Sequence, residues 1–307
     1  MTGKTKYLIV VVGPTAIGKT ARAIDIAQHF SCEIISCDSR QFFKEMTIGT
    51  AVPSESELEA AKHHFIHNKS IFDNYTVGDF EKEAIAKLDE LYQASDFAVM
   101  VGGSGLYVDA VLKGFDDFPE VDAKFRTALA AKFETEGIGY LQDELKRLDP
   151  DYYITVDLDN PQRMMRALEV TLGTGKPYST YLLGKENKRR FTPIVIGLTA
   201  EREIMYERIN RRVDIMMHEG LLEEAQRLYL NRELNALQTV GYRELFAYFD
   251  GETDLDFAVS EIKKNTRRFA KRQMTWFRKN ENVNWFDFND ASNMIFSFIN
   301  DKITQPK

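Results

Sequence analysis

The chain has 307 residues, of which 40 are Lys or Arg and 47 are Asp or Glu, so its formal net charge is -7. This length allows one large or two ordinary domains, and a composition of 44% hydrophobic and 28% charged residues excludes disordered and collagen-like chains. Two cysteines, Cys32 and Cys37, are too few for a disulfide framework or a zinc ribbon, which favours the reducing cytoplasm. Taken alone, the acidic balance argues against a nucleic-acid partner.

Strands and helices alternate along the first hundred residues. The apolar run at residues 7–12 is too short for a membrane span or a signal-peptide core, so we expect no membrane partner. It ends in GPTAIGKT, which matches GxxxxGK[ST] between a strand and a helix, the arrangement of a phosphate-binding loop. The pattern predicts strands at 6–12, 32–36 and 97–101, with helices after residue 20 and at 55–64 and 77–92.

The strand pattern stops at about residue 113. Residues 113–190 contain helical patterns only, at 123–135, 139–148 and 161–172, before an apolar run at 193–198, helices from 201 to 279 and a last strand at 283–288. Continuous apolar strands that alternate with helices indicate a parallel sheet covered on both faces. We therefore predict an α/β fold: a P-loop NTPase-like doubly wound parallel sheet at 1–112 and 191–307, with an inserted all-helical domain at 113–190.

The phosphate loop predicts a ligand with a diphosphate or triphosphate. Backbone amides of such a loop hold phosphates, Lys19 adds a positive charge, and the Thr20 hydroxyl can hold Mg2+. The predicted loop consists of Gly13, Pro14, Thr15, Ala16, Ile17, Gly18, Lys19 and Thr20.

Two polar residues follow other predicted strands. Asp38 comes after the second strand, and Ser104 comes after the third, which ends in Gly102 and Gly103 instead of the carboxylate common in nucleotide hydrolases. Since parallel strands share one carboxyl edge, Asp38 and Ser104 should lie beside the phosphate loop.

One segment is strongly basic, in contrast to the acidic remainder of the chain. Residues 262–279 contain eight basic side chains and no acidic one, on a helical pattern with an apolar stripe. A face made only for solubility usually mixes both signs. This segment predicts a local basic surface, and the acidic remainder can suppress indiscriminate binding.

In order, these motifs resemble those of the bacterial-type tRNA dimethylallyltransferase (tRNA isopentenyltransferase) family over nearly the whole chain. GPTAIGKT is similar to its phosphate loop, DSRQ at 38–41 to DSxQ, IGTA at 48–51 to IGTAKP, and GGSGLY at 102–107 to GGTxLY. QRMMR at 162–166 resembles QRxxR, LQTVGYRE at 237–244 resembles LxTIGYKE, and residues 266–278 resemble TxxxAKRQxTWFR. Departures are Ser104 for Thr, which keeps the hydroxyl, Val52 for Lys, and residues 65–67, where an acid is common.

The resemblance implies a reaction. The loop would bind dimethylallyl diphosphate with Mg2+ as cofactor, and the dimethylallyl group would pass to the exocyclic amine of the adenosine 3′ of the anticodon, position 37 of tRNA. Asp38 would accept the proton of the amine as general base. Lys19, Thr20, Ser104 and Arg212 would stabilise the departing diphosphate. A cytoplasmic monomer is also implied.

The tRNA anticodon stem-loop is the implied macromolecular partner, whose adenine must leave the base stack to reach a cleft. The resemblance and the charges predict contacts from the cleft, the insertion and the basic helix: Asp38, Ser39, Arg40, Gln41, Ser104, Arg126, Gln162, Arg163, Met164, Met165, Arg166, Lys271, Arg272, Gln273 and Arg278.

Three alternatives stay open. An adenylate isopentenyltransferase would share the core but need neither the insertion nor the basic helix. A P-loop small-molecule kinase would bind ATP and use residues 113–190 as a lid. A phosphate-loop RNA-binding factor without catalysis would leave Asp38 and Ser104 unexplained.

Overall fold

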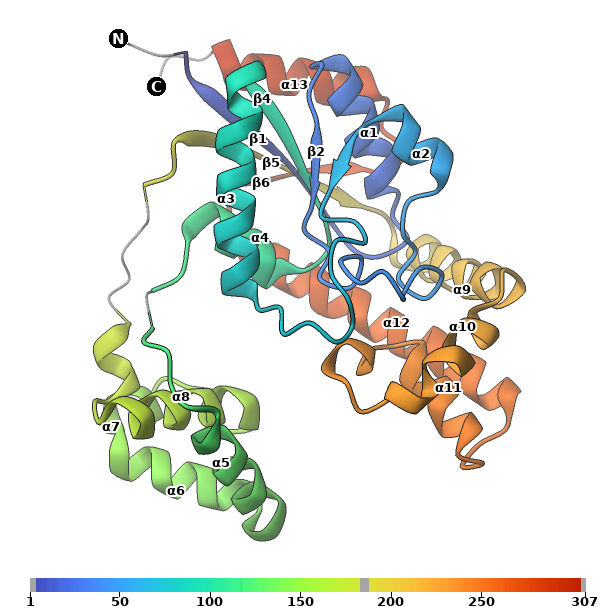
Figure 1. Cartoon of the computed structure of the whole chain (residues 1–307). Helices are drawn as coiled ribbons and strands as arrows, with labels where there is room; N and C mark the ends of the chain where they lie inside the picture. The colour runs from blue at the N-terminus through green and yellow to red at the C-terminus, as the bar shows by residue number, and fades with distance from the viewer. Residues whose placement is uncertain (1–3, 117, 183–187, 305–307) are drawn as a thin grey trace. The chain divides into compact units, whose positions relative to one another are not determined.

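The computed structural model describes residues 4–116, 118–182 and 188–304, and these divide into two compact units. One unit comprises Met1–Lys113 with Lys188–Lys307, and the other comprises Gly114–Asn187, against the insertion expected at 113–190. Each unit has its own hydrophobic core, and Figure 1 shows the helices and strands of both.

A parallel sheet forms the centre of the first unit. Its order is β3-β2-β4-β1-β5-β6, and all adjacent strands run parallel. The strands within the described residues are β1 (Lys6–Val12), β2 (Ile34–Ser36), β3 (His63–His64), β4 (Phe97–Val101), β5 (Phe191–Thr199) and β6 (Val283–Asp287).

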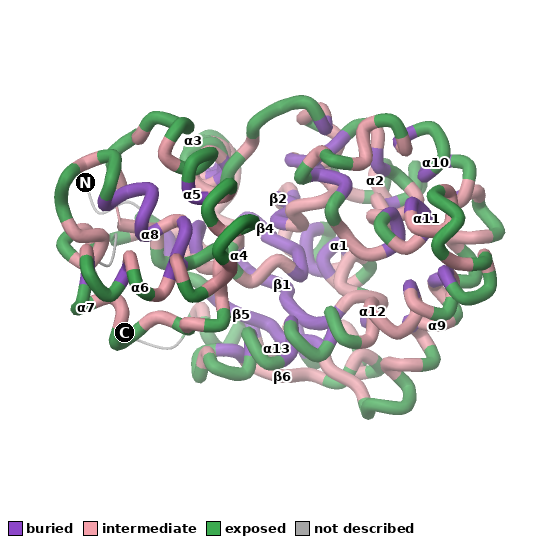
Figure 2. Tube along the Cα trace, turned by 90° about the horizontal axis from the view of Figure 1, so that it is seen from below, coloured by how far each residue is buried: buried purple, intermediate pink, exposed green. Residues whose placement is uncertain are grey.

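Both faces of this sheet are covered, which explains why β1 is apolar without alternation. Leu8 and Val10 pack against α3 (Val77–Ala94) and α4 (Gly105–Lys113), whereas Ile9 and Val11 face α1 (Lys19–His29) and α13 (Ser292–Thr304). Figure 2 shows the central strands buried between more exposed helices. Burying each such side chain contributes about 1.5–3 kcal/mol. The doubly wound parallel fold expected from the sequence is confirmed.

The helix predicted at 55–64 is confirmed at its start, but the prediction is wrong at its C-terminal end. A capping box at Ser54 and Glu57 starts α2 (Glu55–Ala60), which buries none of its residues and ends at Ala60. His63 and His64 instead pair with Ile34 and Ile35 as the short edge strand β3. The reason is tertiary, because this short strand covers the open edge of β2.

The chain after β5 forms a helical layer. The elements are α9 (Arg202–His218), α10 (Leu221–Leu228), α11 (Tyr242–Phe249) and α12 (Leu255–Phe277), with the short 3-10 turns Tyr229–Asn231 and Asn235–Leu237. They share a core that includes Val213, Leu221, Tyr242 and Ile262. Phe277, at the end of α12, joins the core on the α3 and α4 side of the sheet, so α12 connects this layer to the sheet.

The second unit is helical in the residues described. It contains α5 (Ala123–Glu136), α6 (Ile138–Leu148), α7 (Pro150–Tyr153), α8 (Pro161–Thr174) and the 3-10 turn Tyr178–Tyr181. Leu141 and Leu145 of the strongly amphipathic α6 pack on Met164 and Leu168 of α8. Among the described helices of the whole chain, none has the length and apolarity to cross a membrane.

Candidate active site

The phosphate loop follows β1 and leads into α1. Gly13 has φ 145°, and a Cβ there would lie 2.6 Å from the Leu198 carbonyl oxygen, so only glycine allows this close approach to β5. Gly18 is the N-cap of α1 with φ 102°, and no side chain of the described residues caps the helix. The first amides of α1 are therefore free to bind an anion.

Lys19 lies in this loop as a half-buried cation. Its ammonium donates to the Pro14 carbonyl at 2.8 Å. Burial lowers the pKa of Lys19 to about 8, and the negative charge of Asp38 partly opposes this effect. Lys19 forms no ion pair with the residues that the structure describes, so an anionic ligand would provide a direct charge partner.

We expect binding of inorganic diphosphate to be coupled to proton uptake by Lys19. In the free protein this ammonium loses its proton as the pH rises past about 8, whereas a bound anion favours the charged form and raises its pKa. Uptake should therefore appear above pH 8 and vanish near pH 6.5. Titration calorimetry in buffers of different ionisation enthalpy measures it. Lys19→Arg, which stays charged, should lack this uptake; equal uptake in both proteins would contradict the prediction.

The ends of β2 and β4 meet beside the loop, as the sequence predicted. The Ser104 hydroxyl accepts from the Ser39 amide at 3.1 Å, and the Asp38 carboxylate accepts from the Arg40 amide at 3.1 Å. A Cβ at Gly102 would lie 2.5 Å from the Cys37 sulfur, so the glycine allows the two strand ends to approach. Asp38 and Ser104 are thereby fixed on adjacent loops.

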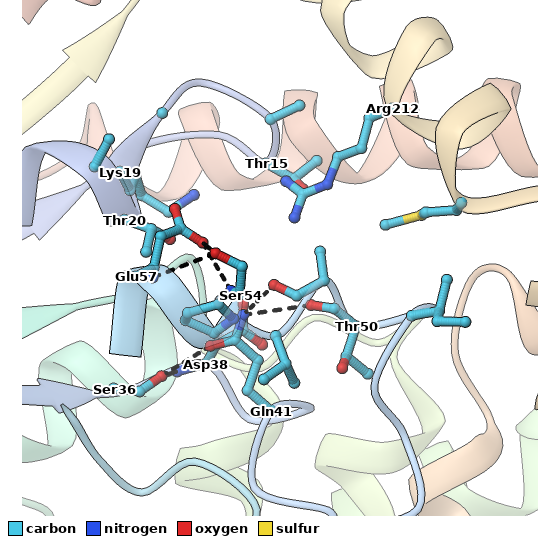
Figure 3. Close-up of a pocket in the computed structure, with 18 of the residues that line it drawn as sticks. Thr15, Lys19, Thr20, Ser36, Asp38, Gln41, Thr50, Ser54, Glu57 and Arg212 are labelled. Carbon is cyan, nitrogen blue, oxygen red and sulfur yellow. Dashed lines mark hydrogen bonds between the residues drawn. The ribbon is translucent and has the colours of Figure 1, made fainter. Parts of the chain in front are cut away.

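Helix α9 lines the site with Arg208, Arg211 and Arg212, of which only Arg212 was predicted from the sequence. Arg208 Nε donates to the Ala16 carbonyl at 2.9 Å, and its guanidinium lies 4.7 Å from the centroid of the Phe288 ring. Arg212, four residues later, lines the same cavity as Lys19 and Thr20 of the phosphate loop (Figure 3). Burial lowers the pKa of Arg212 while Asp38 raises it, so the two groups interact. In the sequence, the i, i+4 spacing of Arg208 and Arg212 placed both side chains on one face of a helix, which was the signal for Arg208.

Two cavities share one wall at this site. The first, about 610 Å³, is lined by Gly18, Lys19 and Thr20 of the phosphate loop. The second, about 480 Å³, is lined by Ser104 and by apolar and aromatic side chains such as Tyr107 and Trp276. The residues that line both are Thr15, Asp38, Thr50, Ala51, Arg212 and Met216.

A buried carboxylate that the sequence analysis did not single out holds part of this wall. Glu224 of α10 is 2% exposed and accepts from the amides of Thr47, Ile48 and Gly49 at 3.0, 2.9 and 2.9 Å. The Tyr242 hydroxyl donates to the same carboxylate at 2.7 Å. A Cβ at Gly49 would lie 2.6 Å from Tyr242, so the IGTA segment needs this glycine. The signal in the sequence was the position of Glu224 on the apolar stripe of α10, which it shares with Leu221, Ala225 and Leu228.

Several residues predicted to contact RNA are engaged inside the protein. Arg40 donates to the carbonyls of Asn235 and Ala236, and Gln41 donates to Ala51. Gln273 is 6% exposed and bonds backbone groups on both sides. These three side chains therefore support the site loops, and their contact with RNA stays a prediction.

In the helical unit, exposure separates the predicted contacts into two groups. Met164 and Met165 belong to the core, so their assignment to the RNA surface is corrected. Arg126 and Arg166 lie 3.3 and 3.4 Å from the buried Glu169 carboxylate. Arg126 also donates to Gln162, and both Gln162 and Arg163 are exposed.

Part of the positive charge of the basic helix α12 is neutralised by neighbouring side chains. Lys263 pairs with Asp214, Lys264 pairs with Glu261, and Arg267 donates to Asn210. Farther along, Lys271, Arg272 and Arg278 are exposed and have no ion pair with the residues the structure describes. The unneutralised charge is therefore concentrated at the C-terminal half of α12.

Comparisons with known proteins identify the family of the chain. The family model described as IPP transferase matches residues 41–280. The tRNA dimethylallyltransferases of Flavobacterium johnsoniae and Christiangramia forsetii are 66% and 59% identical, over 96% and 97% of this chain and 97% and 99% of theirs.

Solved structures have the same fold. The tRNA isopentenylpyrophosphate transferase of Bacillus halodurans is 38% identical with a TM-score of 0.73, covering 98% of this chain and 97% of that chain. A eukaryotic dimethylallyltransferase solved acting on tRNA has a TM-score of 0.82 at 24% identity, over 98% of this chain and 81% of that one, which shows the fold alone. The resemblance drawn from the motifs is confirmed: the chain belongs to the IPP transferase family.

Proposed function

We propose that this enzyme transfers the dimethylallyl group of dimethylallyl diphosphate to the exocyclic amine of the adenosine at position 37 of tRNA and releases diphosphate. The wall shared by the two cavities carries this proposal, because Asp38 and Arg212 line both. A diphosphate on the Lys19 side and an acceptor base on the Ser104 side would meet at these two residues. We propose that it acts as a monomer, and tRNA as substrate supports a cytoplasmic site of action.

The diphosphate end of the donor fits the phosphate loop. Lys19, the free amides at the start of α1 and Arg212 supply the positive charge that stabilises the leaving group. Half-buried in the loop, this charge acts in a medium that screens it less than bulk water does. The apolar lining of the second cavity fits the prenyl chain and a planar base.

The residues present also fit Mg2+. No cluster of three or more His, Cys, Asp or Glu suited to a metal occurs in the parts of the chain that are described. Mg2+ takes few protein ligands and completes its octahedron with phosphate oxygens and water. The Thr20 hydroxyl lines the first cavity beside Lys19 and would be its protein ligand (Figure 3). Bound there, the ion would neutralise charge on the diphosphate oxygens.

Asp38 is the proposed general base. The amine nitrogen forms a bond to the first carbon of the dimethylallyl group, and the bond from that carbon to the diphosphate oxygen breaks. The leaving diphosphate takes the electron pair, and the amine proton passes to the Asp38 carboxylate. The adenine amine is a weak nucleophile because its lone pair is delocalised into the ring, so proton removal assists the reaction.

A transfer assay tests the proposal. The protein is incubated with Mg2+ and labelled dimethylallyl diphosphate, and either unmodified tRNA or AMP is offered as acceptor. Label in tRNA alone is the expected result. Label in AMP would favour an adenylate isopentenyltransferase, and label in neither would contradict prenyl transfer. Transfer from labelled ATP to a small hydroxyl compound would favour the kinase.

The free cations of α12 predict how tRNA affinity depends on salt. The Arg272→Glu and Arg278→Glu double variant should bind tRNA more weakly and reduce the slope of log K against log salt by about one for each phosphate that the protein no longer neutralises. Filter binding at several salt concentrations measures the slope. Lys302→Glu, on the distant α13, is the control and should leave it unchanged. An unaltered slope in the double variant would mean that this face of the helix contacts solvent and no RNA phosphates.

A further inference from the structure

Gln273 connects two loops of the site through one side-chain amide. Its carbonyl oxygen accepts from the Thr15 amide at 2.9 Å, and its NH2 group donates to the Gly103 carbonyl at 3.0 Å. The donor on one side and the acceptor on the other fix the orientation of the amide. Gln273 is 6% exposed, so water competes little for these bonds.

Two glycines next to α12 leave room for this contact. A Cβ at Gly103 would lie 2.1 Å from Gln273 Nε2, so any larger residue would displace the amide. One helical turn further, a Cβ at Gly105 would lie 2.4 Å from the Trp276 ring, whose indole nitrogen donates to Asp109 at 2.9 Å. Helix α12 is thus seated on the turn between β4 and α4 at two points.

Both loops that Gln273 connects carry residues of the proposed reaction. Thr15 lines both cavities and precedes Lys19 in the phosphate loop. Gly103 precedes Ser104, whose hydroxyl accepts from the amide next to Asp38. The Thr15 amide already donates to Gln273, so this amide is bound to the protein and the loop has one fewer donor for phosphate.

We propose that Gln273 is a positioning residue that sets the distance between the phosphate loop and the Ser104 turn, and so aligns donor and acceptor. The inference rests on the proposed function. It assigns the inner face of α12 to the alignment of the reacting groups, while Lys271 and Arg272 on the exposed face are left for RNA. A shift of about 1 Å in such an alignment can lower the rate about 100-fold.

A double-mutant cycle tests this role. Gln273→Ala and Gly103→Ala should each lower the single-turnover rate constant of transfer by about 10-fold to 100-fold, because each breaks the same contact. In the double variant the truncated side chain leaves room for the new methyl group, so the loss should be no larger than in Gln273→Ala. tRNA affinity should stay within about twofold of wild type. Gln226→Ala, on the exposed face of α10, is the matched control.

The outcomes are distinguishable. An unchanged rate constant in Gln273→Ala, or strictly additive losses, would overturn the positioning role. Loss of tRNA affinity together with a lower rate constant would make Gln273 an RNA contact and would also overturn it. If Gln273→Ala fails to fold, Gln273→Met, which keeps the volume, takes its place. If the wild type transfers nothing to tRNA, the proposed function fails, and calorimetry with inorganic diphosphate then decides whether Gln273 orders the phosphate loop: unchanged affinity in the variant would overturn the inference.

Discussion

Asp38→Asn is expected to lower the rate of prenyl transfer about 100-fold to 10,000-fold, the range for loss of a general base. The substitution keeps the side-chain oxygen that accepts from the Arg40 amide at 3.1 Å, so the loop should retain its conformation. Single-turnover transfer to tRNA measures the rate, and filter binding should show nearly unchanged tRNA affinity. An unchanged rate would exclude Asp38 as the base, and lost affinity would make it structural.

A control and a second readout separate chemistry from charge. Asp96→Asn removes an acid that pairs with Lys6 at the opposite end of β4, and it should leave transfer unchanged. Asp38 also raises the pKa of Lys19, so the Asn variant should shift the proton uptake on diphosphate binding to lower pH. A rate loss without this shift would mean that Asp38 and Lys19 do not interact.

Glu224→Ala is expected to destabilise the first unit by about 4 kcal/mol, since it leaves three part-buried amides and one buried hydroxyl without an acceptor. The same loop, with Thr50 and Ala51, forms part of the wall between the two cavities, so transfer should fall as well. Urea unfolding, followed by circular dichroism, measures the loss of stability.

Two milder variants calibrate this prediction. Tyr242→Phe removes one of the four hydrogen bonds and should cost about 1 kcal/mol. Glu224→Gln keeps one acceptor oxygen but turns an NH2 group toward amide donors, so its cost should lie between the other two. Equal stability of Glu224→Ala and wild type would contradict the role of this carboxylate.

The motifs were predictable because their geometry is local. GPTAIGKT follows an apolar strand and precedes a helix, and Asp38 and Ser104 follow strands whose carboxyl ends meet in any parallel sheet. The absence of an acid after β4 was likewise predictable, and the acid nearest to this strand in the sequence, Asp96, lies at its other end and accepts from Lys6. Such features depend on periodicity and strand direction, which the sequence specifies directly.

The helix at 55–64 shows the limit of this reasoning. Residues 55–60 follow a capping box and form a helix, but His63 and His64 are drawn into the sheet by pairing with β2. Similarly, the basic stretch of α12 contains cations whose partners, Asp214 and Asn210, come from α9. Neither outcome follows from local propensity, because the partners are distant in the sequence.

The sequence by itself determined the parallel sheet, the phosphate loop and the placement of Asp38 and Ser104 at one edge, since these follow from the order of strands and glycines. Only the tertiary structure decided which helices supply the rest. It placed Gln273 of α12 between Thr15 and Gly103, Arg208 of α9 on the phosphate loop, and Glu224 beneath the IGTA segment. The physical reason is that buried polar side chains bond whichever backbone groups packing leaves unpaired, and packing joins segments that lie far apart in the chain.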